Sequence, residues 1–166
     1  MILALDPGPE LTGWLLLRHQ MPVDWGKDSN PEVLDIVSAH GSRAELAIEM
    51  VASYGMPVGA EVFETCVWAG RFIERWIASG GREPCRVYRR EVKLHLCGTS
   101  RAKDTNVRQA LIDRYGPGKS TAIGLKATPG PLYGITGDVW QALAVAITAA
   151  DTNKAAPPIT AAAGAR

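Results

Sequence analysis

The sequence predicts an α/β domain in which helices pack on a mixed β-sheet. Short apolar runs of strand length dominate residues 2–51, and helix-like apolar periodicity dominates residues 58–150. Strands followed by interleaved helices are typical of this fold class. The 166 residues, 46% hydrophobic and 21% charged, suit one globular domain with a single core. We assign this domain to residues 1–152 and expect the Ala- and Pro-rich residues 153–166 to form a disordered tail.

The first part of the chain has the pattern of strands joined by turns. Residues 2–6 are an apolar run closed by an Asp-Pro-Gly-Pro turn, and residues 12–18 are the expected hairpin partner. A further strand is expected at 23–25, followed by a loop at 27–31. Residues 46–51 are expected to form a buried strand, with a helix as the alternative because Ala, Glu, Leu and Met favour helix.

The clearest helix covers residues 58–78. Its apolar residues recur at intervals of four and three, which places them on one helical face. Large apolar side chains remain beyond that face, so we expect this helix to contribute to a dimer interface. Core packing is the alternative for its aromatic residues Trp68, Phe72 and Trp76. The residues of the predicted face are Val62, Cys66, Ala69, Ile73 and Trp76.

The remaining elements follow in a regular order. A short strand is expected at 85–88, a helical turn at 91–96 and a helix at 104–115. Residues 116–136 are rich in glycine and proline and are expected to be a mobile loop. The final helix is expected from Thr136-Gly137 to about Ala150.

Charge is distributed unevenly along the chain. The net charge is +1, but residues 1–85 carry −6 and residues 86–126 carry +7. This segregation indicates a polyanionic partner for one part of the surface, with a merely solvated basic face as the alternative.

Other classes of protein fit the sequence poorly. No apolar run reaches the roughly 18 residues that cross a bilayer, and the N-terminus lacks the basic segment of a signal peptide. The three cysteines are odd in number and contain no C-x-x-C pair, which argues against a disulfide framework or a zinc site. We therefore expect a cytoplasmic protein without a membrane partner.

Three acidic residues stand in apolar surroundings. Asp6 ends the first strand, Glu49 lies within residues 46–51, and Asp138 begins the final helix. A buried carboxylate requires a cation or a basic partner, so a shared cation site is one interpretation. Each residue also has a structural alternative, namely a turn residue for Asp6, an exposed position for Glu49 and a first-turn acid for Asp138.

Four segments, in order, resemble motifs of the RuvC Holliday-junction resolvases. The length of the chain resembles the phage and viral branch of that family. The segments are residues 2–8 with Thr12-Gly13, residues 47–49, residues 90–93 with 98–100 and Lys103, and residues 138–147.

The resemblance implies an RNase H-like fold, with a five-stranded mixed sheet and helices on both faces. It implies a homodimer that cuts four-way DNA junctions by paired, metal-dependent phosphodiester hydrolysis, leaving 5′-phosphate and 3′-hydroxyl ends. It implies a pair of Mg²⁺ or Mn²⁺ ions and no nucleotide cofactor. The implied catalytic residues are Asp6, Glu49, Asp138 and Lys103, and the implied metal ligands are Asp6, Glu49, Asp138 and Gln141.

The basic segment supplies the expected DNA contacts. They are Arg89, Arg90, Lys93, Arg101, Lys103, Arg108, Lys119 and Lys126. The chain departs from the family at Gln141, where a second acid is usual, and at Ala52, near which an aromatic wedge is usual. Tyr54 is the nearest aromatic residue to that position.

Three alternatives remain open. One is a nuclease for flaps, forks or structured RNA, and another is a branched-DNA binding module that does not cut. The third is an actin-like ATPase or sugar kinase, whose opening motif is similar. That class needs two related lobes, for which 166 residues are too few.

Overall fold

The computed structural model describes residues 1–53, 55 and 57–153. Its main sheet has five strands in the order β3-β2-β1-β4-β5, so β1 is central. β2 runs antiparallel to β1 and β3, whereas β4 runs parallel to β1 and β5. The strands are β1 (Ile2–Asp6), β2 (Leu11–Arg18), β3 (Met21–Ser29), β4 (Glu45–Met50) and β5 (Cys85–Tyr88).

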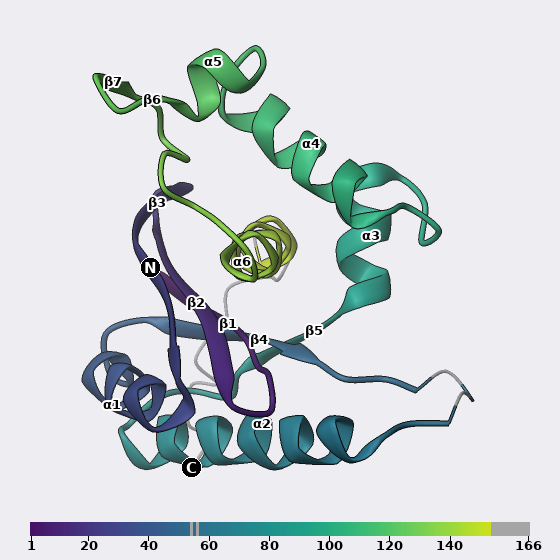
Figure 1. Ribbon diagram of the computed structural model, residues 1–166. Helices are drawn as coiled ribbons and strands as arrows, with labels where there is room; N and C mark the ends of the chain where they lie inside the picture. Colours follow the sequence, from purple (N-terminus) through teal and green to yellow (C-terminus); the bar gives the residue numbers. More distant parts are fainter. Residues whose placement is uncertain (54, 56, 154–166) are drawn as a thin grey trace, which may run out of the picture.

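Helices cover both faces of this sheet, as the resemblance to the resolvases implies. Figure 1 shows α1 and α2 below the sheet and α6 above it, with α3 and α4 beyond α6. A short helix, α5, and a two-stranded sheet of β6 and β7 lie between α4 and α6 in the chain. The bounds are α1 (Asn30–His40), α2 (Ala60–Ala78), α3 (Arg89–Cys97), α4 (Asp104–Tyr115), α5 (Lys119–Ala122), β6 (Gly124–Leu125), β7 (Thr128–Pro129) and α6 (Val139–Asn153).

Strand alternation divides the core into two layers. Leu3 and Leu5 of β1 pack with α1 and α2, whereas Ile2 and Ala4 pack against α6. Successive side chains of a strand point to opposite faces, so Asp6 follows Ile2 and Ala4 onto the α6 face. The same alternation places Glu49 on the α6 face, because Ala47 belongs to the α6 core.

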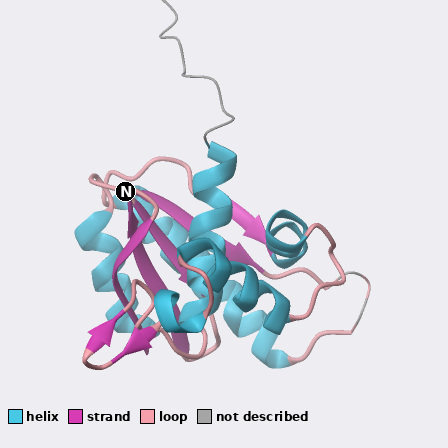
Figure 2. Cartoon of the chain, turned by 90° about the horizontal axis from the view of Figure 1, so that it is seen from above, coloured by secondary structure: helices cyan, strands magenta, loops and turns pink. Residues whose placement is uncertain are grey.

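α6 is the central element of the upper layer. Residues 142–147 are all fully buried between the sheet and the helices α3 and α4. Figure 2, viewed from above, shows α6 crossing the strands with other helices beside it. Its small residues, chiefly alanine, allow the helix to lie close to the sheet on one side and to its neighbouring helices on the other.

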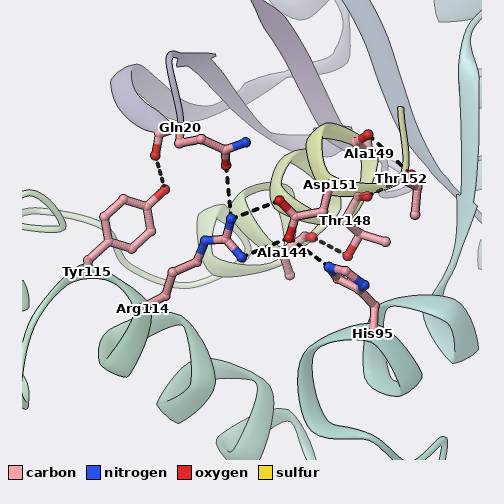
Figure 3. A network of polar contacts seen from close by, with 9 residues as sticks. All are labelled: Gln20, His95, Arg114, Tyr115, Ala144, Thr148, Ala149, Asp151 and Thr152. Carbon is pink, nitrogen blue, oxygen red and sulfur yellow. Dashed lines mark hydrogen bonds and ion pairs between the residues drawn. The ribbon is translucent and has the colours of Figure 1, made fainter. Parts of the chain in front are cut away.

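A polar network fastens the far end of α6 (Figure 3). The Asp151 carboxylate accepts hydrogen bonds from Arg114 of α4, at 2.8 Å to each oxygen, and lies 2.8 Å from His95 Nε2 of α3. Tyr115 donates a hydrogen bond to the carbonyl oxygen of Gln20 in the β2–β3 turn, at 2.7 Å. The network therefore joins α3, α4 and the strand pair to one end of α6.

Two of the expected loops are regular structure. Residues 27–29 belong to β3, and α1 begins at Asn30, so the expected loop at 27–31 is wrong. Pro31 stands in the first turn of α1, where its missing N–H costs nothing, and the Ser29 N–H donates to Glu32 at 3.0 Å. The expected mobile loop at 116–136 is also wrong in part, because it contains α5, β6 and β7.

The buried face of α2 shares only Ala69 and Trp76 with the predicted one. The buried residues are Thr65, Ala69, Phe72 and Trp76, whereas Cys66 is exposed. Phe72 and Trp76 are therefore core residues, which is the alternative to a role in a dimer interface. At the other end of the chain, α6 extends to Asn153, one residue into the expected tail, and residues 154–166 lie outside the described part. No described helix is long and apolar enough to cross a membrane.

Candidate active site

Asp6 and Glu49 are neighbours because β1 and β4 are parallel. Leu5 pairs with Ile48, so the residues that follow lie side by side at the carboxyl ends of both strands. Their side chains point to the same face, toward α6. The strand interpretation of residues 46–51 is thus confirmed for Glu45–Met50, and the helical alternative is wrong.

Asp138 reaches the same place from the start of α6. It directly precedes the helix, and its carbonyl oxygen accepts hydrogen bonds from Gln141 and Ala142. Gly13 pairs with Asp6 across β1 and β2, and a Cβ on Gly13 would lie only 2.9 Å from the backbone carbonyl of Asp138. The glycine therefore permits the close approach that brings Asp138 beside the strand carrying Asp6.

The three acids form one electrostatic group. Burial, together with the charges of Glu49 and Asp138, raises the pKa of Asp6 to about 8, although Arg89 and Lys27 act in the opposite direction. Burial also raises the pKa of Glu49, against the opposing charge of Arg89. One oxygen of Glu49, Oε2, is buried and has no hydrogen-bond partner within the described residues. The site therefore holds more negative charge than its burial accommodates easily.

Two basic side chains partly offset this charge. Lys27 of β3 lies 2.6 Å from an Asp138 carboxylate oxygen. Arg89, at the start of α3, lies 3.5 Å from Glu49 Oε2 and donates a short hydrogen bond to Gln141 Oε1. The same guanidinium is 2.8 Å from Asp104 Oδ1, and Lys93 is 3.4 Å from that oxygen.

The oxygen-rich cluster suits a hard divalent cation, although Lys27 lies against Asp138 and Arg89 against Glu49. Within residues 1–53, 55 and 57–153, no three His, Cys, Asp or Glu side chains form a group that could hold a metal ion as it stands. A cavity of about 240 Å³ opens beside Asp6, Glu49 and Arg89. Carboxylate oxygens and an amide oxygen are the donor types that Mg²⁺ and Mn²⁺ prefer, and a cation here would relieve the excess negative charge.

The residues expected to contact DNA fall into two groups. Arg89 and Lys93 are half-buried in the ion pairs with Asp104. The other six residues are exposed on α3, α4 and α5, on the connection before α4 and in the turn between β6 and β7. They are Arg90, Arg101, Lys103, Arg108, Lys119 and Lys126.

Lys103 and Arg108 are exposed cations on either side of Asp104 in the chain. Lys103 directly precedes α4, and Asp104, the next residue, is held by Arg89. The guanidinium of Arg108 lies over the Trp140 ring, 4.7 Å from its centroid, beside a cavity of about 380 Å³ that Asp104 and Gln141 also line. The basic segment thus adjoins the acid cluster through α3 and α4.

Sequence reasoning missed Lys27 and Asp104. Lys27 falls in the segment expected to be a loop, and only its register opposite Gly13 in β3 shows why it reaches Asp138. Asp104 is one of only three acids among the basic residues 86–126, which is the signal that could have identified it. Tyr54, considered as an aromatic wedge, lies outside the described residues, and Ala52 lines the cavity beside Glu49.

The fold has known counterparts among solved structures. A structure of Thermus thermophilus RuvC matches with a TM-score of 0.63 and 17% identity, covering 93% of this chain and 95% of the other. T. thermophilus RuvC in complex with a Holliday junction substrate matches with a TM-score of 0.62 and 18% identity, covering 93% and 94%. No protein-family model and no curated protein matches the chain. The expected RuvC-type, RNase H-like fold is therefore confirmed.

Proposed function

We propose that this protein is a structure-selective DNA endonuclease that resolves four-way junctions. The observation that carries the proposal is the convergence of Asp6, Glu49 and Asp138 on the α6 face of a RuvC-type sheet. A RuvC with this fold binds a Holliday junction substrate, and the basic segment of this chain adjoins its acid cluster.

The residues fit the metal ions that this fold implies. Asp6, Glu49 and Asp138 would hold a pair of Mg²⁺ or Mn²⁺ ions, with Gln141 as an uncharged oxygen donor. Such ions supply an activated water and stabilise the charge on the leaving oxygen during phosphodiester hydrolysis. The buried Glu49 Oε2 without a hydrogen bond and the raised pKa of Asp6 support this assignment, because a divalent cation would satisfy both groups.

The chain's own residues would orient the DNA. Lys103 would contact the scissile or an adjacent phosphate, and the exposed arginines and lysines of α3–α5 would neutralise others. Contacts of this kind respond to the shape of the DNA backbone more than to its sequence. A two-fold homodimer would suit the two-fold symmetry of a junction, because its two active sites could cut two matched strands. The enzyme would act in the cytoplasm.

A second candidate is a protein that binds branched DNA without cutting it. The specific observation in its favour is Gln141, which brings no charge and whose side-chain oxygen accepts a hydrogen bond from Arg89. Cleavage of flaps, forks or structured RNA would use the same chemistry on another substrate. One experiment distinguishes both alternatives from the resolution of four-way junctions.

The test compares four-way, forked, flapped and linear DNAs and a structured RNA, with Mg²⁺ or Mn²⁺ for cleavage and Ca²⁺ for binding. We expect paired nicks in the four-way junction and little cutting of linear DNA. Binding in Ca²⁺ without nicks in either active metal would establish the binding module, and preferential cutting of flaps, forks or RNA would reassign the substrate.

The matched variant is Asp6→Asn, which removes a charge but little volume. We expect it to abolish cleavage and to leave junction binding in Ca²⁺ near the wild-type level. Retained cutting by the purified variant would remove Asp6 from the active site and contradict the proposal.

A further inference from the structure

Arg89 lies within the acid cluster. Its side chain is only 24% exposed, and the Glu49 side chain beside it is 15% exposed. One guanidinium nitrogen faces Glu49 Oε2 and donates to Gln141, while another lies 2.8 Å from Asp104 Oδ1. Arg89 therefore touches two of the groups that would hold metal ions and one acid outside that set.

The ion pair of Arg89 with Asp104 is closer than its ion pair with Glu49. The distance of 2.8 Å to Asp104 is that of a strong charge-assisted hydrogen bond, and Lys93 adds a second cation to the same carboxylate. The distance of 3.5 Å to Glu49 Oε2 is beyond a good hydrogen bond, and that oxygen has no such partner among the described residues. Arg89 is thus held firmly by Asp104 and only loosely by Glu49.

We propose that Arg89 is a positioning residue that serves as an internal counter-cation. In the metal-free protein it contacts Glu49 and Gln141, and once divalent ions bind it keeps only its ion pair with Asp104. The inference rests on the proposed metal-dependent function. A divalent ion attracts the carboxylates more strongly than a monovalent guanidinium does, and once bound at Glu49 it would repel the positive charge of Arg89. Asp104 gives Arg89 a second position, so the exchange leaves no buried arginine unpaired.

This arrangement makes Arg89 a competitor of the metal ions. Removing its charge should raise the affinity for divalent ions and destabilise the metal-free protein, because the acids then repel one another without a partner. Removing Asp104 should have the opposite effect on affinity, because Arg89 would lose its alternative position and rest on Glu49. Substitution of Asp104 should have little effect on the affinity for divalent ions in a protein that already lacks Arg89.

The experiment measures Mn²⁺ binding to the purified, metal-free protein without DNA, by calorimetry and by the electron paramagnetic resonance signal of free Mn²⁺. Arg89→Met is compared with Arg90→Met, which removes the same charge from the adjacent, exposed residue. We expect Arg89→Met to bind Mn²⁺ about tenfold more tightly than the wild type, the scale of one nearby charge, and Arg90→Met to change affinity by less than about threefold.

Two further variants complete the cycle. Asp104→Asn should weaken Mn²⁺ binding, and Arg89→Met/Asp104→Asn should bind about as tightly as Arg89→Met. Melting in EDTA should show a lower Tm for Arg89→Met than for Arg90→Met, and excess Mn²⁺ should remove most of that difference. This stability readout does not depend on cleavage.

The outcomes separate this inference from the proposed function. Equal Mn²⁺ affinity of wild type and Arg89→Met, in a protein that binds Mn²⁺ and cuts junctions, would overturn the role of Arg89 alone. Absence of Mn²⁺ binding in the wild type and all variants would overturn both proposals. Mn²⁺ binding that appears only in Arg89→Met would support the competition directly.

Discussion

Asp6 and Gly13 show how single residues build the acid cluster. Asp6 is a half-buried carboxyl group that feels the charges of Glu49 and Asp138, and Gly13 faces it across the strand pair and leaves room for Asp138. The two residues differ in their effect on the stability of the metal-free fold. Asp6 is unfavourable, because its carboxyl group lies beside two other acids, whereas Gly13 is needed because its missing side chain leaves room for the start of α6.

The raised pKa of Asp6 predicts a pH dependence of stability in EDTA. The folded protein retains a proton up to about pH 8, whereas the unfolded chain releases it near the ordinary value of 3.8. The free energy of unfolding should therefore fall as pH rises from about 4 to about 8 and level off above that range. Glu49, whose pKa is also raised, acts in the same direction.

Thermal unfolding between pH 5 and pH 9 checks this dependence. Asp6→Asn should show a shallower decline with pH and a higher Tm than the wild type at the alkaline end. Parallel curves for the two proteins would show that Asp6 does not carry the effect.

Gly13→Ala should damage both stability and the site. The new Cβ would lie 2.9 Å from the carbonyl carbon and oxygen of Asp138, so the start of α6 must move away from β2. We expect a loss of about 1–3 kcal/mol in the free energy of unfolding, typical of overpacking, and a strong loss of cleavage. Denaturant unfolding and the junction assay measure the two effects.

The control is Gly70→Ala, in the middle of α2. A Cβ there meets no atom of the described residues within 4 Å, and alanine favours helix over glycine. This variant should not lower the free energy of unfolding. An equal loss in both variants would contradict the steric explanation for Gly13.

The helices and strands that could be predicted from the sequence are those with a strong local pattern of apolar residues. The apolar run ending at Asp6, the hairpin partner and the helix at 104–115 are all observed. α1 was missed because its start, Asn30-Pro31, also has the composition of a turn. The structure resolves this ambiguity through long-range contacts, since the buried Asn30 accepts a hydrogen bond from Thr12 and donates one to the Gly8 carbonyl.

The same limit applied to the candidate site. Its three acids could be predicted because each interrupts a local apolar pattern. Lys27 and Asp104 could not be linked to them, because their contacts depend on strand register and on the packing of α3 against α4 and α6. On α2, Thr65 is buried where the pattern predicted Cys66. Neighbouring residues lie on adjacent faces of a helix, so the apolar pattern alone does not decide which of the two faces the core.

α2 has an exposed apolar stripe that predicts where the proposed dimer forms. Phe63, Val67 and Ile77 are 62%, 56% and 42% exposed, and their spacing places them along one side of the helix. Phe63→Glu should therefore convert a dimer into a monomer while leaving the fold intact. Light scattering after size-exclusion chromatography measures the mass.

Leu125→Glu is the matched control, since Leu125 is 72% exposed in the small β6–β7 sheet, away from α2 in the fold. It should leave the mass unchanged. A wild-type protein that stays monomeric at high concentration would contradict the dimer.

Across the whole molecule, the two charge classes occupy different layers. The acidic part of the chain forms β1–β4 with α1 and α2, and the basic residues 86–126 form β5 and the α3–α5 region on the α6 side. A polyanion would be attracted to the basic α3–α5 region, which adjoins the acid cluster through Arg89, and repelled by the α1–α2 layer. Charge segregation in the sequence thus corresponds to a division in space.

Lys103→Ala should test this division. If Lys103 contacts a phosphate, the slope of log affinity for a junction against log salt concentration should become shallower by about one. Cleavage should also slow, because a cation beside the reacting phosphate is lost. Arg82→Ala, an exposed cation from the acidic part of the chain, should leave the slope unchanged.

The position of α6 has a consequence for synthesis on the ribosome. Asp6 and Glu49 are synthesised early, whereas Asp138 and α6, which covers one sheet face, are synthesised about 90 residues after Glu49. A nascent chain lacking α6 therefore exposes an uncovered apolar sheet and carries an incomplete set of acids. Chaperones would meet such an intermediate, and the three acids of the cluster would come together only when α6 docks on the sheet.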